Sequence, residues 1–217
     1  TEIYTLSLHD ALPILNPAVD HNIIVENFKT GEVIRATHST VTAAGKGINV
    51  ARTVTCLRQN ATAFCLVGKQ EAHHYKSLRS PRFNLHMVPV DGTTRSNITI
   101  SDARGKLAAH LQTQGFSVRE EQLQEMTYDL ENKAGKGDVL VISGSTPNGV
   151  PPGYYERLIR NCREKGCRVI FDSSGFYLKE GLEGIPEVIK PNIEELKELS
   201  GSDIRTVSDI IDRKSVV

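Results

Sequence analysis

The sequence predicts an α/β protein built on a mostly parallel sheet with helices on both faces. In the second half of the chain, residues 139–142, 168–172 and 187–190 are short runs that are apolar on both faces. Strands of this kind are typical of parallel sheets that helices cover on both sides. Amphipathic segments typical of helices alternate with them at residues 118–134, 151–165 and 193–199. Short loops join the segments, which favours βαβ units.

The first half of the chain predicts a second, smaller β layer. Residues 61–67 and 83–90 read as further strands, whereas residues 32–42, 95–101 and 107–111 are richer in polar side chains and fit no βαβ unit. Polar and apolar side chains alternate along residues 96–101, as in a strand with one solvated face. We therefore predict a small β lid, formed by about residues 23–43 and 88–111, over the ligand edge of the sheet.

The two ends of the chain carry a different signal. Residues 1–14, TEIYTLSLHDALPI, back-translate without a mismatch to a widely used sequencing-library adapter, and residues 212–217 back-translate to the complementary adapter. We therefore expect residues 15–211 to be the biological domain, incomplete on its C-terminal side, and we set both ends aside in predicting the fold. An ordinary N-terminal strand and an ordinary tail are the alternative.

Composition excludes several classes of function. Basic and acidic residues each number 26 among 217 residues, so the formal net charge is zero. This balance argues against nucleic acid or an anionic membrane as a partner, and no run of 18 apolar residues predicts a membrane helix. The four cysteines lack CxxC spacing, which indicates reduced thiols in a cytoplasmic protein: Cys56, Cys65, Cys162 and Cys167.

The most informative segment is residues 44–52, AGKGINVAR, where two glycines flank a lysine before a helical pattern. Glycines at a loop-to-helix junction let a ligand approach the backbone, and the free N–H groups of the helix start favour oxygen-rich or anionic groups. The pattern is neither the dinucleotide fingerprint, which would need a glycine at Val50, nor a Walker P-loop. The segment therefore indicates a sugar, a phosphate or both.

Five short motifs follow one another along the chain: Asn16-Pro17-Ala18-Val19-Asp20, Gly45-Lys46-Gly47-Ile48-Asn49, Thr94-Arg95-Ser96-Asn97, Ser143-Gly144-Ser145 and Lys190-Pro191-Asn192-Ile193-Glu194-Glu195. In this order they resemble the ribokinase-like (PfkB) carbohydrate kinases, and most of all the branch that includes 1-phosphofructokinase and tagatose-6-phosphate kinase. The resemblance covers nearly all of residues 15–211. It implies a ribokinase-like fold and transfer of the γ-phosphoryl group of ATP, with Mg²⁺, to a ketohexose phosphate.

The resemblance also implies a set of substrate-binding residues. Asp20 would accept hydrogen bonds from sugar hydroxyls, and the glycine loop with Asn49 would meet further hydroxyls through its backbone and amide groups. Arg95 would bind the substrate phosphate, because a guanidinium binds phosphate in a bidentate manner. The full set is Asp20, Gly45, Lys46, Gly47, Asn49, Arg95 and Ser145. From the residues alone, a solvated turn, a plain glycine turn and an exposed strand arginine are the competing interpretations.

One residue of the loop departs from the family pattern. The family usually carries a double glycine before the lysine, and Ala44 replaces the first of the two. If that position requires a positive φ, alanine would strain the loop by about 1 kcal/mol.

On the nucleotide side, the resemblance implies that Lys190 lies near the phosphates of ATP and that Asn192 and Glu195 order Mg²⁺ through water. Spacing alone favours a plainer interpretation, in which the same asparagine and glutamate form a helix capping box, and both can hold. Residues 172–175 end a strand on the same edge of the sheet and receive no assigned role.

The family's catalytic base is missing. That base is the aspartate of a Gly-Ala-Gly-Asp loop, and no such sequence occurs among residues 15–211. We therefore assign no catalytic residue and expect an inactive fragment of a kinase such as a 1-phosphofructokinase, which forms fructose 1,6-bisphosphate. Tagatose-6-phosphate kinase and 6-phosphofructokinase activities are the alternatives within the family. A non-catalytic sugar-phosphate-binding protein is the alternative of another class, and a homodimer through the β lid is the expected assembly.

Overall fold

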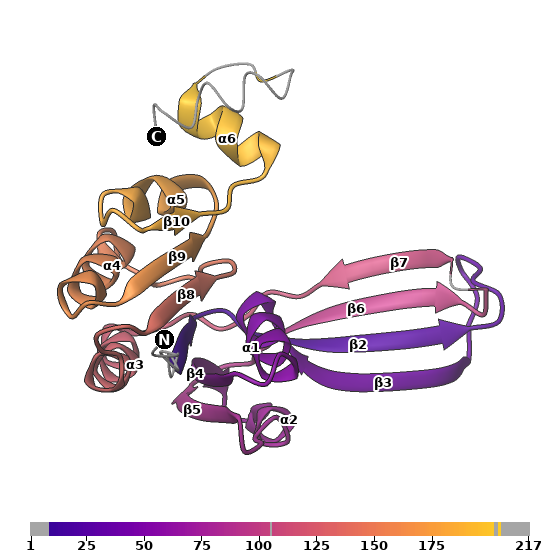
Figure 1. Cartoon of the computed structure of the whole chain (residues 1–217). Coiled ribbons are helices and arrows are strands. Elements are labelled where there is room, and N and C mark those ends of the chain that lie inside the picture. Colours follow the sequence, from indigo (N-terminus) through magenta and orange to yellow (C-terminus); the bar gives the residue numbers. More distant parts are fainter. Residues whose placement is uncertain (1–8, 105, 202–203, 205–217) are drawn as a thin grey trace.

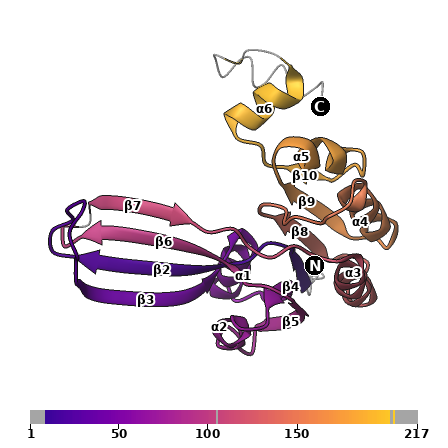
Figure 2. The same ribbon diagram turned by 180° about the vertical axis from the view of Figure 1, so that it is seen from behind.

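The computed structural model describes residues 9–104, 106–201 and 204. It consists of an α/β body and a long β blade that projects from one side of that body (Figure 1). The opposite view shows the same separation, with the helices gathered around the body and none on the blade (Figure 2). The predicted α/β class, with a mostly parallel sheet, flanking helices and a β lid, is confirmed.

The body sheet has six strands in the order β10-β9-β8-β1-β4-β5, and every neighbouring pair is parallel. Their apolar runs explain this arrangement, because a parallel sheet is buried on both faces. The strands are β1 (His9–Ile14), β4 (Asn60–Gly68), β5 (Phe83–Val90), β8 (Val139–Ser143), β9 (Arg168–Asp172) and β10 (Val188–Ile189).

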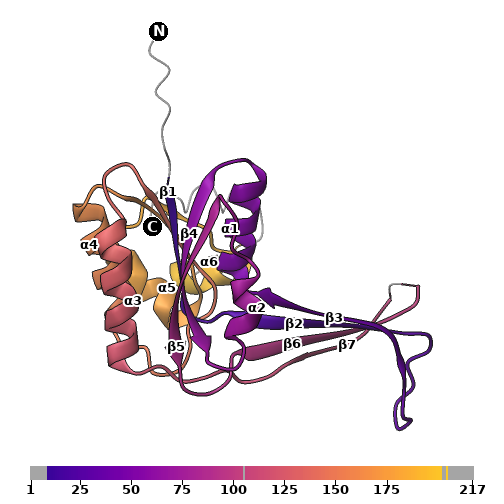
Figure 3. The same ribbon diagram turned by 90° about the horizontal axis from the view of Figure 1, so that it is seen from below.

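Helices cover the two faces of the body sheet (Figure 3). On one face, α1 (Lys46–Cys56) and α2 (Ala72–Lys76) enclose a core that includes Leu12, Ile48 and Tyr75. On the other face, α3 (Glu120–Lys133), α4 (Tyr154–Glu164) and α5 (Gly175–Leu182) enclose a second core. The last described helix, α6 (Ile193–Ser200), follows β10 and lies beside α5. Among the described helices, none is long and apolar enough to cross a membrane.

Strand β1 is built from residues that the sequence analysis set aside. It lies at the centre of the sheet between β8 and β4, and the side chains of Leu12 and Ile14 are almost completely buried. Leaving residues 1–14 out of the predicted fold was therefore wrong. The segment HDALPI supplies buried apolar side chains to the sheet, whatever the origin of its coding sequence. The adapter origin of residues 1–14 and 212–217 stays a prediction, and residues 1–8 and 212–217 lie outside the described residues.

The blade is the lid, defined here as strands β2 (Ala18–Val25), β3 (Ala36–Ala44), β6 (Arg95–Asp102) and β7 (Leu107–Gln112) in the order β3-β2-β6-β7. Strand β2 is parallel to β6 and antiparallel to β3, and β6 forms an antiparallel pair with β7. The lid begins at Ala18, earlier than expected, and β5 belongs to the body. Only the base of the lid adjoins the body, and the rest projects away from it (Figure 3).

Candidate functional site

A polar cavity of about 340 Å³ lies where the base of the lid meets the carboxyl ends of the body strands. In a parallel α/β sheet this edge is the usual place for a ligand. Six of the seven predicted substrate-binding residues line the cavity: Asp20, Gly45, Lys46, Asn49, Arg95 and Ser145. A larger hollow of about 480 Å³ lies between α3 and α4, but it contains none of the predicted residues.

The glycine loop enters α1 beside this cavity. Gly45 has a φ of 124°, and an added Cβ would lie 3.3 Å from the Cα of Pro17, so this position requires glycine. Ala44 has no positive φ, and the strain considered for it does not arise.

Gly47 differs from the prediction, because it does not line the cavity. It lies in the first turn of α1, and an added Cβ would come within 2.6 Å of the Ile14 side chain. Gly47 therefore lies on the buried face of α1 and allows this helix to pack closely on β1.

Asp20 and Asn97 form the lid wall of the cavity. The register places them opposite each other on the parallel strands β2 and β6, and the Asn97 amide nitrogen donates to the Asp20 carboxylate at 2.8 Å. The other end of the amide, Asn97 Oδ1, is buried and accepts no hydrogen bond from the described residues. Because a carboxylate only accepts, this pairing fixes which end of the amide faces Asp20.

Arg95 is held at the base of the lid by backbone carbonyl groups. Its Nε donates to Pro17 O at 3.3 Å and its Nη2 to Asn16 O at 3.4 Å. Burial lowers the pKa of Arg95 from its ordinary value, but a guanidinium remains charged in proteins. The Asn16 amide in turn donates to Ser145 Oγ at 3.0 Å, so one short chain of contacts joins Arg95 to the β8 loop.

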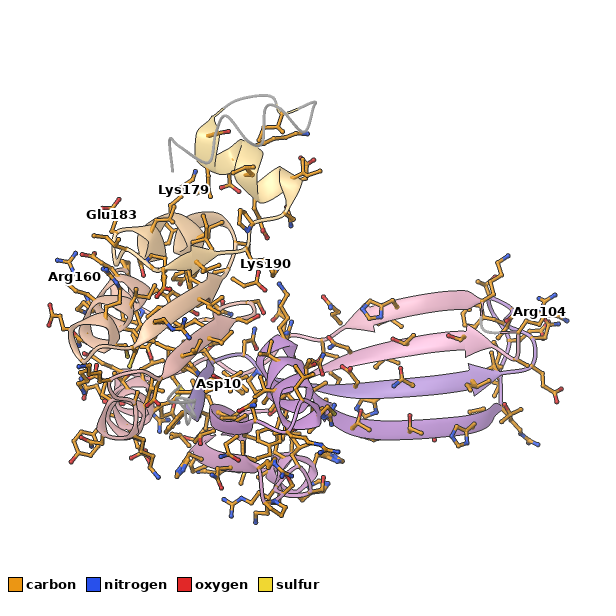
Figure 4. All side chains as sticks on the ribbon, viewed as in Figure 1. Asp10, Arg104, Arg160, Lys179, Glu183 and Lys190 are labelled. Atoms are coloured by element: carbon orange, nitrogen blue, oxygen red, sulfur yellow. The ribbon has the colours of Figure 1, made fainter. Side chains whose placement is uncertain are left out.

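Asp172, at the end of β9, connects the two halves of the predicted site. Its side chain is only 8% exposed; one oxygen lies 3.6 Å from Lys46 Nζ and the other lies 3.2 Å from Lys190 Nζ. Ser143 also donates to this carboxylate, at 3.0 Å. Lys190 directly follows β10, and Figure 4 shows it on the side of the body that faces the lid. Asp172 thus holds a lysine from the glycine loop and a lysine from the predicted nucleotide side.

Asn192 and Glu195 do not line the cavity. They form a reciprocal capping box at the start of α6, in which Glu195 N donates to Asn192 Oδ1 at 2.9 Å and Asn192 N donates to Glu195 Oε2 at 2.8 Å. The plainer interpretation from spacing is therefore present in the structure. Asn192 is exposed and Glu195 is half-buried, so both side chains are accessible to a ligand in spite of the capping box.

Several residues of the cavity carried no predicted role: Asn97, Gln112, Gly144, Ser173 and Ser174. Asn97 stood within a recognised motif, and its position two residues after Arg95 on an alternating strand was the available signal. Gln112 reaches the cavity only through strand pairing, for which the local sequence offers no sign. Ser173 and Ser174 belong to residues 172–175, which the sequence places at this edge of the sheet without a role.

The fold and the site together define an α/β protein with a polar cavity at the carboxyl edge of its sheet, beside a β lid. A family model described as pfkB family carbohydrate kinase matches residues 13–216, and the chain belongs to that family. The resemblance inferred from the five motifs is thus confirmed.

Individual relatives agree with this assignment. The chain is 30% identical over 210 residues to a 1-phosphofructokinase of Bacillus subtilis, which covers 96% of the chain and 66% of that protein. It is 31% identical over 206 residues to a tagatose-6-phosphate kinase of Staphylococcus epidermidis, covering 94% and 65% of the two chains. It therefore spans about two thirds of the length of these relatives.

Solved structures show the same similarity. Phosphofructokinase-2 of Escherichia coli in complex with fructose-6-phosphate is similar with a TM-score of 0.84 and 28% identity, over 94% of this chain and 68% of that one. A possible 1-phosphofructokinase of Thermotoga maritima is similar with a TM-score of 0.77 and 28% identity, over 94% and 67% of the two chains.

Proposed function

We propose that this chain forms the sugar-phosphate half of an ATP-dependent ketohexose-phosphate kinase, similar to 1-phosphofructokinase, whose product is fructose 1,6-bisphosphate. One observation carries the proposal: Asp20, Asn49 and Arg95, from three separate segments, line a single polar cavity. An anionic acceptor, an amide and a permanent cation are together suited to a molecule with both hydroxyl and phosphate groups. The names of the relatives support the same substrate class.

In this proposal each side chain of the cavity has a task. Asp20 accepts hydrogen bonds from neighbouring hydroxyls, and the Asn49 amide and Ser145 hydroxyl meet others. Arg95 attracts the phosphate already present on the sugar, and Lys46, which lines the same cavity, adds a second positive charge. The preference for a sugar phosphate over a free sugar then rests mainly on Arg95.

ATP and Mg²⁺ are the proposed cofactors, held by Lys190, Asn192 and Glu195. The donor set suits the metal, since amide and carboxylate oxygens are ligands that Mg²⁺ accepts and the ion usually keeps several waters. Among the described residues no three acidic, histidine or cysteine side chains group as a metal cage, which agrees with a metal held mainly through water and nucleotide phosphates. When bound, the ion neutralises charge on the phosphoryl group being transferred.

We assign no catalytic base within these 217 residues, because no Gly-Ala-Gly-Asp sequence occurs in them. The chain by itself is therefore proposed to bind a sugar phosphate without turning it over. This also supports the second candidate function, a non-catalytic sugar-phosphate-binding protein. An experiment separates the two candidate functions. If the chain is part of a kinase, adding a segment that carries the catalytic aspartate should restore phosphoryl transfer; if it is a binding protein, it should not.

A homodimer through the lid, in a cytoplasmic protein, belongs to the same proposal. The register places Ile23, Val41, Ile98 and Leu111 on the lid face opposite Asp20, and Val41 and Leu111 are 43% and 51% exposed. An apolar sheet face this exposed favours burial against a partner. Sedimentation at several concentrations tests this part, and Ile98→Asp is expected to shift the chain to monomer.

Calorimetric titration tests the substrate class. The chain is titrated with fructose 1-phosphate, tagatose 6-phosphate, fructose 6-phosphate and fructose, and the sugar phosphates are expected to bind more tightly than fructose. Arg95→Ala should remove that preference, whereas Arg104→Ala, at the far tip of the lid (Figure 4), should not. Equal binding of fructose and its phosphates by the unaltered chain would reject the proposal, and the order among the three phosphates separates the kinase alternatives.

A further inference from the structure

The lid is attached to the body at one small region. Four residues at the lid base are almost completely buried, namely Ala18, Val19, Ala43 and Ala44, whereas residues 36–42 of β3 are exposed. Ala18 and Ala44 are register partners, and Ala18 also lies opposite Arg95 on β6. Three lid strands therefore meet at Ala18. The site residues Asp20, Gly45 and Arg95 all lie within two residues of this point or directly opposite it.

Tyr75, from the short helix α2, reaches this meeting point from the body. Its side chain is completely buried, and its hydroxyl donates to the carbonyl oxygen of Ala18 and lies 3.4 Å from that of Ala44. Burial raises the pKa of the Tyr75 hydroxyl well above its ordinary value, so the group remains a donor. A single hydroxyl thus contacts the first residue of β2 and the last residue of β3.

The turn before α2 holds the third strand. Glu71 Oε2 accepts a hydrogen bond from Thr94 N at 3.0 Å, and Thr94 Oγ1 accepts one from Gly68 N at 2.9 Å. An added Cβ at Gly68 would lie 2.4 Å from that Glu71 oxygen, so glycine is needed for the close approach. Thr94 directly precedes Arg95, and residues 68–75 therefore hold the starts of β2 and β6 and the end of β3.

We propose that Tyr75, together with Glu71, is a positioning element that anchors the lid base and thereby sets the geometry of Asp20, Gly45 and Arg95 around the substrate. Tyr75 is not among the residues that line the substrate cavity; it acts through Ala18 and Ala44. The consequence for ligand affinity rests on the proposed sugar-phosphate function, whereas the anchoring of the lid does not.

The anchor predicts a local effect when the hydroxyl is removed. Tyr75→Phe keeps the buried ring and deletes the one donor, so the body should stay folded while the lid base opens more often. Amide hydrogen exchange in peptides covering residues 18–20 and 42–45 should accelerate about five- to tenfold, the equivalent of one ordinary hydrogen bond. Under the proposed function, the dissociation constant for fructose 1-phosphate should rise by a similar factor.

Tyr177→Phe is the matched control. Tyr177 also donates its hydroxyl to a backbone carbonyl, that of Val150, at 3.0 Å, on the opposite face of the sheet. This variant should lose similar stability but leave exchange at the lid base and sugar-phosphate affinity unchanged.

Each outcome decides between the alternatives. Unchanged exchange at residues 18–20 and 42–45 in Tyr75→Phe, or an equal change in Tyr177→Phe, would overturn the anchor whether or not a ligand binds. Faster exchange with unaltered affinity would overturn the positioning role. If the unaltered chain binds no sugar phosphate, the proposed function fails, and the exchange experiment still decides whether Tyr75 anchors the lid. Glu71→Ala, which removes the bond to Thr94 N, should accelerate exchange at residues 94–96 and serves if Tyr75→Phe does not fold.

Discussion

Asn97 donates a hydrogen bond to Asp20 at 2.8 Å although the two residues are 77 positions apart in the chain. Strands β2 and β6 run parallel in the lid, and their register sets the two side chains side by side on the face that meets the cavity. The carboxylate predicted to bind sugar hydroxyls is thus held by a neighbour that carried no predicted role.

Replacement of Asn97 should therefore weaken ligand binding through Asp20. Asn97→Asp keeps the shape of the side chain, removes the donor and places a second carboxylate beside the first. Hydrogen bonds to charged groups contribute about 1.5–3 kcal/mol, so affinity for fructose 1-phosphate should fall by roughly 10- to 100-fold. Calorimetric titration measures the change.

The control for this prediction is Asn22→Asp, which adds the same charge on β2 two residues beyond Asp20, at an exposed position on the same face of the lid. It should reduce affinity far less, because it breaks no contact with Asp20. Equal losses in the two variants would mean that added negative charge, and not the Asn97–Asp20 pair, controls binding.

Local pattern predicts much of the body. Strands β5 (Phe83–Val90) and β9 (Arg168–Asp172) begin and end at the residues that the sequence predicts. Helix α5 carried no comparable signal, because it contains Gly181, where an added Cβ would lie 2.2 Å from the Phe171 ring. The glycine is required by packing on β9, and packing of this kind cannot be read from a single segment. Helix α2, with five residues, is too short for a periodic pattern.

For the site, too, local sequence predicts some residues, and others depend on contacts between distant segments. The motifs identified six residues of the cavity because each lies in a short segment with its own chemistry. Asn97, Gln112 and Asp172 depend on contacts between segments: the first two on strand register in the lid, the third on two lysines from distant loops. Gly47 was assigned to the substrate on its motif alone, whereas its packing against Ile14 required the central strand that had been set aside.

Gly47→Ala should destabilise the protein by packing. An added Cβ would overlap the Ile14 side chain, and overpacking of a buried site costs about 1–3 kcal/mol. The free energy of unfolding, measured with urea, should fall by this amount. Ile14→Ala, which makes room, should cost less in the Gly47→Ala background than in the unaltered chain. If the two losses simply add, the close contact between α1 and β1 is not the reason for the glycine.

Asp172→Asn should weaken the binding of both ligands and cost little stability. The lysines beside this carboxylate are 59% and 68% exposed, so the two ion pairs contribute at most about 1 kcal/mol together, and an amide oxygen can still accept from Ser143. Lys46 and Lys190 would no longer be held at the site. Under the proposed function, affinities for fructose 1-phosphate and for ATP should both fall about threefold or more, which is roughly 0.7 kcal/mol.

Asp138→Asn is the control for this variant, since Asp138 precedes β8 at the opposite edge of the sheet and accepts a backbone hydrogen bond from Gly135. It should leave both affinities unchanged. A loss of affinity for only one of the two ligands after Asp172→Asn would show that the carboxylate does not couple the two halves of the site.

His86 should make stability depend on pH. Burial, and then the nearby charge of Lys133, whose Nζ lies 3.0 Å from His86 Nε2, lowers the pKa of this histidine in the folded state. The unfolded chain then binds the proton more readily, so the free energy of unfolding should decrease as the pH falls below about 6.5. His86→Gln, whose side-chain oxygen can still accept from Lys133, should reduce this decrease in urea titrations at pH 7.5 and 5.5. His38→Gln, at an exposed position on the lid, should leave it unchanged, and an equal decrease in both variants and the unaltered chain would exclude His86 as its source.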